Sequence, residues 1–80
     1  MPSVTLPDQL RHYAGGAALL DCTAANYRDL LAEIEAAHPG LGAELEELAV
    51  AIDGQIYQDA LLEPMAPGSE VFFMPKIEGG

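Results

Sequence analysis

One stretch of the chain carries a clear helical signal, and it limits what the remaining residues can form. Asn26 is a good helix N-cap, and Asp29 three residues later fits the acidic partner of a capping box. The sequence His38-Pro39-Gly40 ends the helix, because proline disfavours helical geometry at the preceding residue and glycine permits the turn. Between these signals, apolar residues recur at helical spacing: Tyr27, Leu30, Leu31, Ile34 and Ala37 or His38. The pattern predicts one main helix whose apolar stripe faces a sheet.

Glu33 and Glu35 fall outside the apolar stripe of this helix, so we expect both on its solvent side. Residues 41–47 predict a short helical turn or a loop. In the connection that follows the later strands, Leu61 and Leu62 are expected to anchor the core.

The segments on both sides of the helix are short and have the alternation or the β-branched and aromatic content of strands. They are residues 3–6, 17–22, 48–52, 55–57 and 71–74. Turn signals separate them: Gly15-Gly16 after the first, Asp53-Gly54 as the strongest hairpin dipeptide, and Pro67-Gly68 before the last.

The order strand, strand, helix, strand, short strand, strand predicts an α+β roll with one main helix across a mixed sheet of four or five strands. Adjacent, parallel first and last strands at the centre would make it a β-grasp. A chain of 80 residues is expected to form one domain. We assign residues 1–74 to that domain and residues 75–80 to a flexible C-terminal tail.

The charge balance excludes whole classes of partner. Thirteen acidic residues stand against Arg11, Arg28 and Lys76, for a formal net charge of −10. Nucleic acids and anionic membrane surfaces are bound by Lys and Arg, so we expect no nucleic-acid or membrane partner. Such a protein is steered toward basic protein surfaces, although the same acids could simply keep it soluble. The cluster Glu44, Glu46 and Glu47 has the same two interpretations.

Cys22 is the single cysteine, so no intramolecular disulfide is possible and a reducing cytoplasm fits the chain best. A persulfide-carrying role for Cys22 is the weaker interpretation; a lone cysteine among apolar residues is usually a small buried hydrophobe. His12 and His38 have no partner spacing for a metal site. No set of nucleophile, base and orienting residue is present, so the sequence does not predict an enzyme.

The chain ends in Gly79-Gly80 after a strand rich in aromatic residues and a proline. Average glycine usage gives such an ending by chance roughly once in 200 chains. A tail without Cβ atoms is narrow and can adopt backbone angles that other residues cannot. Such a tail could carry a terminal carboxylate deep into an ATP-binding cleft of another protein.

Several segments together resemble the MoaD/ThiS family of ubiquitin-like sulfur carriers. Residues 68–80, Gly-Ser-Glu-Val-Phe-Phe-Met-Pro-Lys-Ile-Glu-Gly-Gly, resemble the turn, strand and Gly-Gly tail that end this family. Residues 25–31 and 38–41 resemble its helix start and helix end. Leu10-Arg11 with Ala14-Gly15-Gly16 is similar to its first loop, and residues 50–54 are similar to its Val-Asn-Gly hairpin. The resemblance covers nearly the whole chain and rests on the order and spacing of the motifs.

The resemblance implies a ubiquitin-like β-grasp and a role as a carrier rather than an enzyme. A ubiquitin-activating-like enzyme would use ATP to adenylate Gly80, and a sulfur donor would convert it to a thiocarboxylate. That group would then supply sulfur to a biosynthetic enzyme. The chain itself would bind no cofactor and no metal. Access to the activating enzyme would depend on Gly79, Glu78, Ile77 and Lys76, and docking on Phe72, Met74 and Pro75.

Some features depart from the family pattern. Ser69 stands where Asp is usual, a change expected to affect only the turn, and Lys76 and Glu78 put charges on a tail that is commonly apolar. The opening strand lacks the Phe-Ala-rich start common in molybdopterin synthase small subunits, so it resembles carriers that serve amino-acid or other sulfur pathways, such as cysteine, methionine or thiamine biosynthesis. The small subunit of molybdopterin synthase and a ubiquitin-like modifier or binding domain that is never thiolated remain alternatives. Phe72 and Phe73 alternate, so one faces the core, but the sequence leaves open which.

Overall fold

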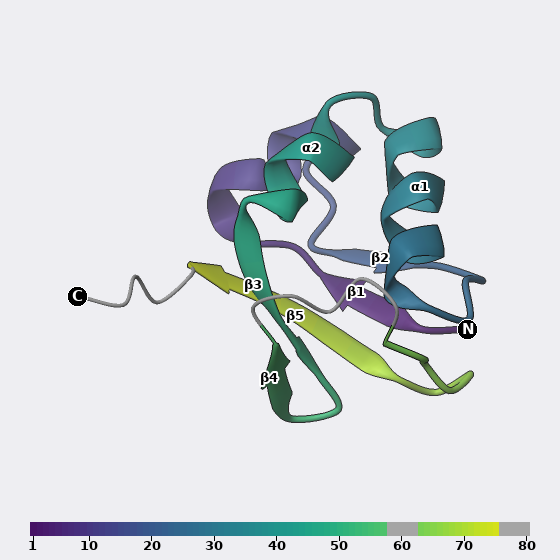
Figure 1. The fold of residues 1–80 in the computed structure, drawn as a ribbon. Coiled ribbons are helices and arrows are strands. Elements are labelled where there is room, and N and C mark those ends of the chain that lie inside the picture. Colours follow the sequence, from purple (N-terminus) through teal and green to yellow (C-terminus); the bar gives the residue numbers. More distant parts are fainter. Residues whose placement is uncertain (58–62, 76–80) are drawn as a thin grey trace.

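The computed structural model describes residues 1–57 and 63–75, which form a five-stranded sheet covered on one face by helices (Figure 1). The chain order of the elements matches the predicted order, with one additional short helix. The elements are β1 (Ser3–Thr5), the 3-10 helix η1 (Asp8–Ala14), β2 (Leu19–Asp21), α1 (Tyr27–Ala37), α2 (Leu41–Glu46), β3 (Leu48–Ile52), β4 (Gln55–Tyr57) and β5 (Glu70–Pro75).

The strands lie in the order β2-β1-β5-β3-β4, so the first and last strands are neighbours at the centre. They run parallel, with Val4 opposite Val71, while β5 and β3 run antiparallel, with Ile52 opposite the same Val71. The central parallel pair is the feature that defines a β-grasp, so the predicted fold class is confirmed.

Pairing of Ile52 with Gln55 closes the Asp-Gly hairpin, in which Asp53 has φ 50° and Gly54 φ 85°. Positive φ at both central residues is the type I′ geometry that this dipeptide favours.

Helix α1 forms as the sequence predicts. The Asn26 side chain accepts a hydrogen bond from the Asp29 amide at 2.8 Å, and its own amide group donates to the Asp29 carboxylate at 3.1 Å. The stripe Tyr27, Leu30, Leu31 and Ile34 is buried against the sheet. It packs there with inward residues of the strands, among them Val4, Val50, Ile52, Val71 and Phe73. No helix within the described ranges is long and apolar enough to cross a membrane.

The expectation that Glu33 and Glu35 lie on the solvent side of α1 is met only in part, because both residues are half-buried and turned toward neighbouring loops. Glu33 Oε1 accepts hydrogen bonds from the backbone amides of Thr23 and Ala24 at 2.9 and 3.1 Å. Glu35 Oε2 accepts from the Gly40 amide at 2.7 Å, while its Oε1 is buried with no hydrogen-bond partner. Both carboxylates serve to fix loops beside α1, a role that helical periodicity alone does not reveal.

The region between β1 and β2 also differs from the expected long loop. Residues 8–14 form η1, which buries Leu10 and ends at Gly15 in the left-handed conformation (φ 67°). Strands β1 and β2 are shorter than the predicted ranges 3–6 and 17–22. Strand β5 extends one residue further at each end than the predicted range 71–74. Residues 41–46 form α2, whose Leu41 and Leu45 are fully buried.

The connection from β4 to β5 passes the start of α1. The Tyr27 amide donates to the Glu63 carbonyl and the Met65 amide donates to the Ala25 carbonyl, at 3.0 and 2.8 Å. Leu61 and Leu62, the predicted core anchors of this connection, lie outside the described residues.

Ser69 ties the hairpin to the start of β5, and it is buried with 2% of its surface exposed. Its hydroxyl donates to Asp53 Oδ2 at 2.8 Å and accepts from the Ala66 amide at 2.9 Å. The Glu70 amide donates to Asp53 Oδ1 at 3.0 Å. Bonds from the Glu70 amide and the Ser69 hydroxyl hold the pKa of Asp53 below its ordinary value. Ser69 thus does more than shape a turn: it fixes where β5 begins.

We predict that Gly42→Ala destabilises the fold. A Cβ at Gly42 would lie 2.9 Å from Glu35 Cβ and 3.1 Å from the Leu31 carbonyl oxygen, so α1 and α2 would have to separate. The expected loss is about 1–3 kcal/mol of unfolding free energy, measured by urea denaturation with circular dichroism. Gly68→Ala is the matched control, because its Cβ would meet nothing within 4 Å. Equal stability of the two variants would contradict the tight packing of α1 on α2.

A second prediction concerns the Asp53 carboxylate. Because its folded-state pKa is depressed, its stabilising effect is present above the ordinary aspartate range, about 4, and is lost as the pH falls through the folded pKa. Ser69→Ala removes one of the donors, so we expect the pKa of Asp53 to rise. Carboxyl carbon NMR across a pH series measures that shift directly. The difference in unfolding free energy between wild type and variant should become smaller in acid. An Asp53 pKa that the substitution left unchanged would show that the Ser69 hydroxyl does not stabilise the Asp53 carboxylate.

Candidate partner-docking face

Strand β5 sends alternate side chains to opposite faces of the sheet, and this settles which phenylalanine is available to a partner. Phe73 is 8% exposed and packs in the core against Tyr27, with ring centroids 6.2 Å apart. Phe72 points to the face that the helices leave uncovered and is 45% exposed. Burying an aromatic ring of this size against a partner is a strong source of binding energy.

The strand registers place Phe72 in a row that crosses the whole sheet. Thr5 and Ala51 lie directly opposite Phe72 on its two neighbouring strands. Leu19 lies opposite Thr5, and Ile56 lies opposite Ala51. We call Leu19, Thr5, Phe72, Ala51 and Ile56 the apolar row.

The ends of the apolar row are its most accessible parts. Leu19 is 62% exposed and Ile56 is 55% exposed, and each lies two strands from Phe72 along the row. Exposed large apolar side chains that share one face, with no covering element among the described residues, are typical of a protein-binding surface. We assign this face as the candidate docking site.

Of the other two predicted docking residues, Met74 shares the face of Phe72 and Pro75 does not. Met74 is half-buried on the same face as Phe72, opposite Ala49. Pro75 is exposed as the last residue of β5, but it has the parity of Phe73 and does not join the apolar row. The predicted covalent and tail positions, Gly80, Gly79, Glu78, Ile77 and Lys76, lie outside the described residues.

Sequence reasoning missed Ile56 and Leu19. Ile56 could have been found, because the Asp53-Gly54 hairpin fixes the register that puts it opposite Ala51. Leu19 could not, because its alignment with Thr5 depends on η1, which brings β2 back beside β1.

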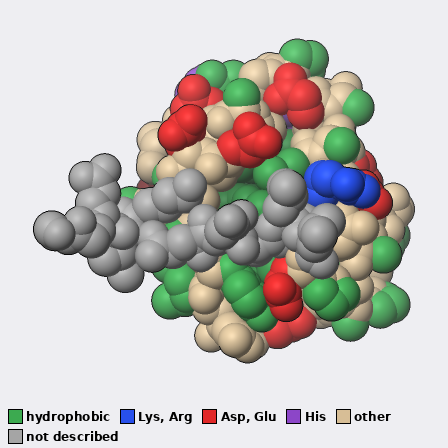
Figure 2. All heavy atoms as spheres, viewed as in Figure 1, with side chains coloured by type: hydrophobic (Ala, Val, Ile, Leu, Met, Phe, Trp, Pro, Cys, Tyr) green, Lys and Arg blue, Asp and Glu red, His purple; other side chains and the backbone are tan. Residues whose placement is uncertain are grey.

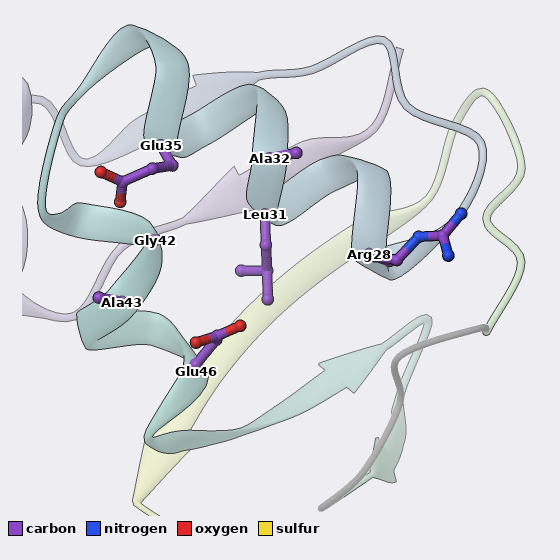
Figure 3. Close-up of a pocket in the computed structure, with 7 residues that line it drawn as sticks. All are labelled: Arg28, Leu31, Ala32, Glu35, Gly42, Ala43 and Glu46. Atoms are coloured by element: carbon purple, nitrogen blue, oxygen red, sulfur yellow. The ribbon is translucent and has the colours of Figure 1, made fainter.

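A groove of about 360 Å³ lies on the other side of the molecule, between α1 and α2 (Figure 3). Leu31 and Glu46 point into the space between the helices, and Glu35 is turned toward Gly42. Arg28 extends from the far end of α1. The groove is lined mainly by apolar surface, and it contains no set of side chains arranged for catalysis.

Cys22 has the environment of a structural residue. It is 3% exposed, beside a cavity of about 70 Å³ that Glu33, Ile34 and His38 also line. Burial and the negative charges of Glu33 and Asp21 raise the pKa of the Cys22 thiol to about 11. Since the thiolate is the reactive form, a pKa this high makes Cys22 a poor nucleophile at neutral pH.

The remaining polar candidates form no reactive cluster in the part of the chain that the structure describes. No group of three or more His, Cys, Asp or Glu side chains there could hold a metal ion. His12 is exposed and stacks on Tyr13, and His38 is the C-cap of α1. Figure 2 shows acidic side chains gathered over α2, where the exposed Glu44, Glu46 and Glu47 lie.

Comparisons with known proteins agree with the fold. A model of the ThiS family matches residues 4–80. A chain from the BexX/CysO complex of Amycolatopsis orientalis superimposes with a TM-score of 0.86 at 20% identity over 100% of both chains. CysO of Mycobacterium tuberculosis gives 0.86 at 17% identity, over 96% of this chain and 100% of that one. SAMP1 of Haloferax volcanii gives 0.75 at 24% identity, over 99% and 98%. No curated protein matches the sequence.

Proposed function

The chain belongs to the ThiS family of ubiquitin-like sulfur carriers. We therefore propose that the C-terminal carboxylate of Gly80 is the group that takes up a sulfur atom and delivers it to another protein. A member of this family is a carrier protein and not an enzyme. The observation that carries the proposal is the order of features along the chain: β5 exposes Phe72 on the uncovered face of the sheet, and the Gly-Gly ending follows this strand in the sequence.

The proposed chemistry needs no reactive side chain from this domain. A Gly80 carboxylate oxygen attacks the α-phosphorus of ATP in the partner, pyrophosphate leaves, and an acyl-adenylate forms. Hydrosulfide, or a donor that supplies it, then attacks the carbonyl carbon and AMP leaves. The product is a thiocarboxylate, formed without any change in oxidation state at carbon. The raised pKa of the Cys22 thiol, which keeps it protonated at neutral pH, is consistent with a cycle that uses the C-terminal carboxylate instead.

The accepting enzyme belongs to a biosynthetic pathway for cysteine, methionine, thiamine or a related metabolite. CysO of Mycobacterium tuberculosis shares this fold, as does SAMP1, a small archaeal modifier protein. The modifier role therefore stands as the rival, and it predicts an isopeptide bond between Gly80 and a lysine of another protein.

We predict that incubation with the organism's own ubiquitin-activating-like enzyme, ATP and sodium sulfide replaces one oxygen of the Gly80 carboxylate by sulfur. Mass spectrometry of the C-terminal peptide detects the change. Oxidation of Met74 gives nearly the same mass shift, so fragmentation must place the sulfur on Gly80. A Cys22→Ser variant removes the competing thiol.

The control for loading is a chain that lacks Gly80, which should remain unmodified. The enzyme must also be competent on a carrier known to be its substrate. With that competence shown, an unmodified Gly80 would refute the carrier role, and an isopeptide product would establish the modifier role instead.

We further predict that Phe72→Ala weakens binding to the adenylating enzyme about 30-fold, the loss of roughly 2 kcal/mol typical of a central aromatic anchor. Isothermal titration calorimetry measures the affinity. His12→Ala is the matched control, since it removes an exposed ring from η1, away from the sheet face. Equal affinities of the two variants would show that the apolar row is not the docking site.

A further inference from the structure

A second row of side chains lies beside the apolar row on the same face of the sheet. Ser3 is opposite both Asp21 on β2 and Glu70 on β5. These three residues have the same parity as Thr5, Leu19 and Phe72. We call Asp21, Ser3 and Glu70 the acidic row.

The carboxylates of the acidic row are accessible and have no basic partner among the residues that the structure describes. Asp21 and Glu70 are exposed, and the Ser3 hydroxyl donates a hydrogen bond to Asp21 Oδ1 at 3.4 Å. Within residues 1–57 and 63–75, the ion pairs are Arg11 with Asp8 and Arg28 with Asp29, on η1 and α1.

The two rows have a fixed spacing and a fixed direction. Glu70 and Phe72 are two residues apart on β5, so their side chains are separated by roughly 7 Å along the strand. The acidic row lies at the start of β5, and the tail leaves from its end. A partner that matched only the apolar row could approach in either direction along β5, whereas a partner that matches both rows can approach in one.

We infer that this face binds a protein surface in which an apolar pocket for Phe72 is bordered by Lys or Arg side chains facing Asp21 and Glu70. The charge pairing directs the C-terminal tail toward the partner's active site. This inference rests on the proposed function, since the adenylating enzyme is the partner it describes. Exposed charges at the edge of an interface chiefly raise the association rate and select the orientation, and their effect weakens with salt.

The test is a pair of double charge reversals with the same change in net charge. Asp21→Lys with Glu70→Lys alters the acidic row, and Glu44→Lys with Glu47→Lys alters exposed residues at α2. Surface plasmon resonance measures association of each full-length variant with the adenylating enzyme at low and high salt. We expect the acidic-row variant to associate at least about 10-fold more slowly at low salt, with a smaller difference at high salt. The α2 variant should stay within about 2-fold of wild type.

Equal slowing of both variants would mean that only net charge matters and would overturn the inference, as would no slowing of either. Neutral pairs, Asp21→Asn with Glu70→Gln against Glu44→Gln with Glu47→Gln, give the same comparison should a lysine variant fail to fold. Gly80 loading at saturating enzyme separates the two proposals. Equal binding of both variants with normal loading overturns this inference alone; failure of the wild-type chain to bind at all overturns both.

Discussion

The parallel pairing of β1 with β5 is the interaction on which the rest of the structure depends. It joins the first and last strands of the chain at the centre of the sheet, with Val4 beside Val71 and both fully buried. Non-local pairing of this kind costs loop-closure entropy, which the burial of the apolar core must offset. The hydrogen bonds that Asp53 accepts from the Ser69 hydroxyl and the Glu70 amide fix the position at which β5 enters that pairing.

Once β5 is held at the centre, its alternation divides the molecule into two faces with different roles. Val71 and Phe73 face α1 and build the core, whereas Phe72 and Met74 face away from it. The same strand then continues toward the Gly-Gly terminus. The central strand thereby links the candidate docking face to the Gly-Gly end of the sequence, so a partner that bound Phe72 would also fix the point from which residues 76–80 continue.

Local sequence signals predicted the helices and strands better than they predicted the contacts between segments distant in the chain. The Asn26 cap, the helical stripe and the Asp53-Gly54 hairpin each depend on neighbouring residues, and each formed as expected. Periodicity could not show that Glu33 and Glu35 turn back to bind loop amides, because those amides lie five to ten residues away in the chain. The apolar row needed the register of all the strands, which only the folded sheet supplies. The sequence therefore offered Phe72 as a docking candidate but left open whether Phe72 or Phe73 faces outward, and it did not single out Leu19 or Ile56.

We propose that the activating enzyme docks on the sheet face and not in the groove between α1 and α2. The most direct measurement is an NMR titration of the nitrogen-15-labelled chain with the unlabelled enzyme. We expect the largest amide shifts or losses of intensity at Thr5, Leu19, Ile56 and Phe72, with little change in the residues that line the groove. Perturbation confined to Arg28, Ala43 and Glu46, with the sheet face unaffected, would contradict it.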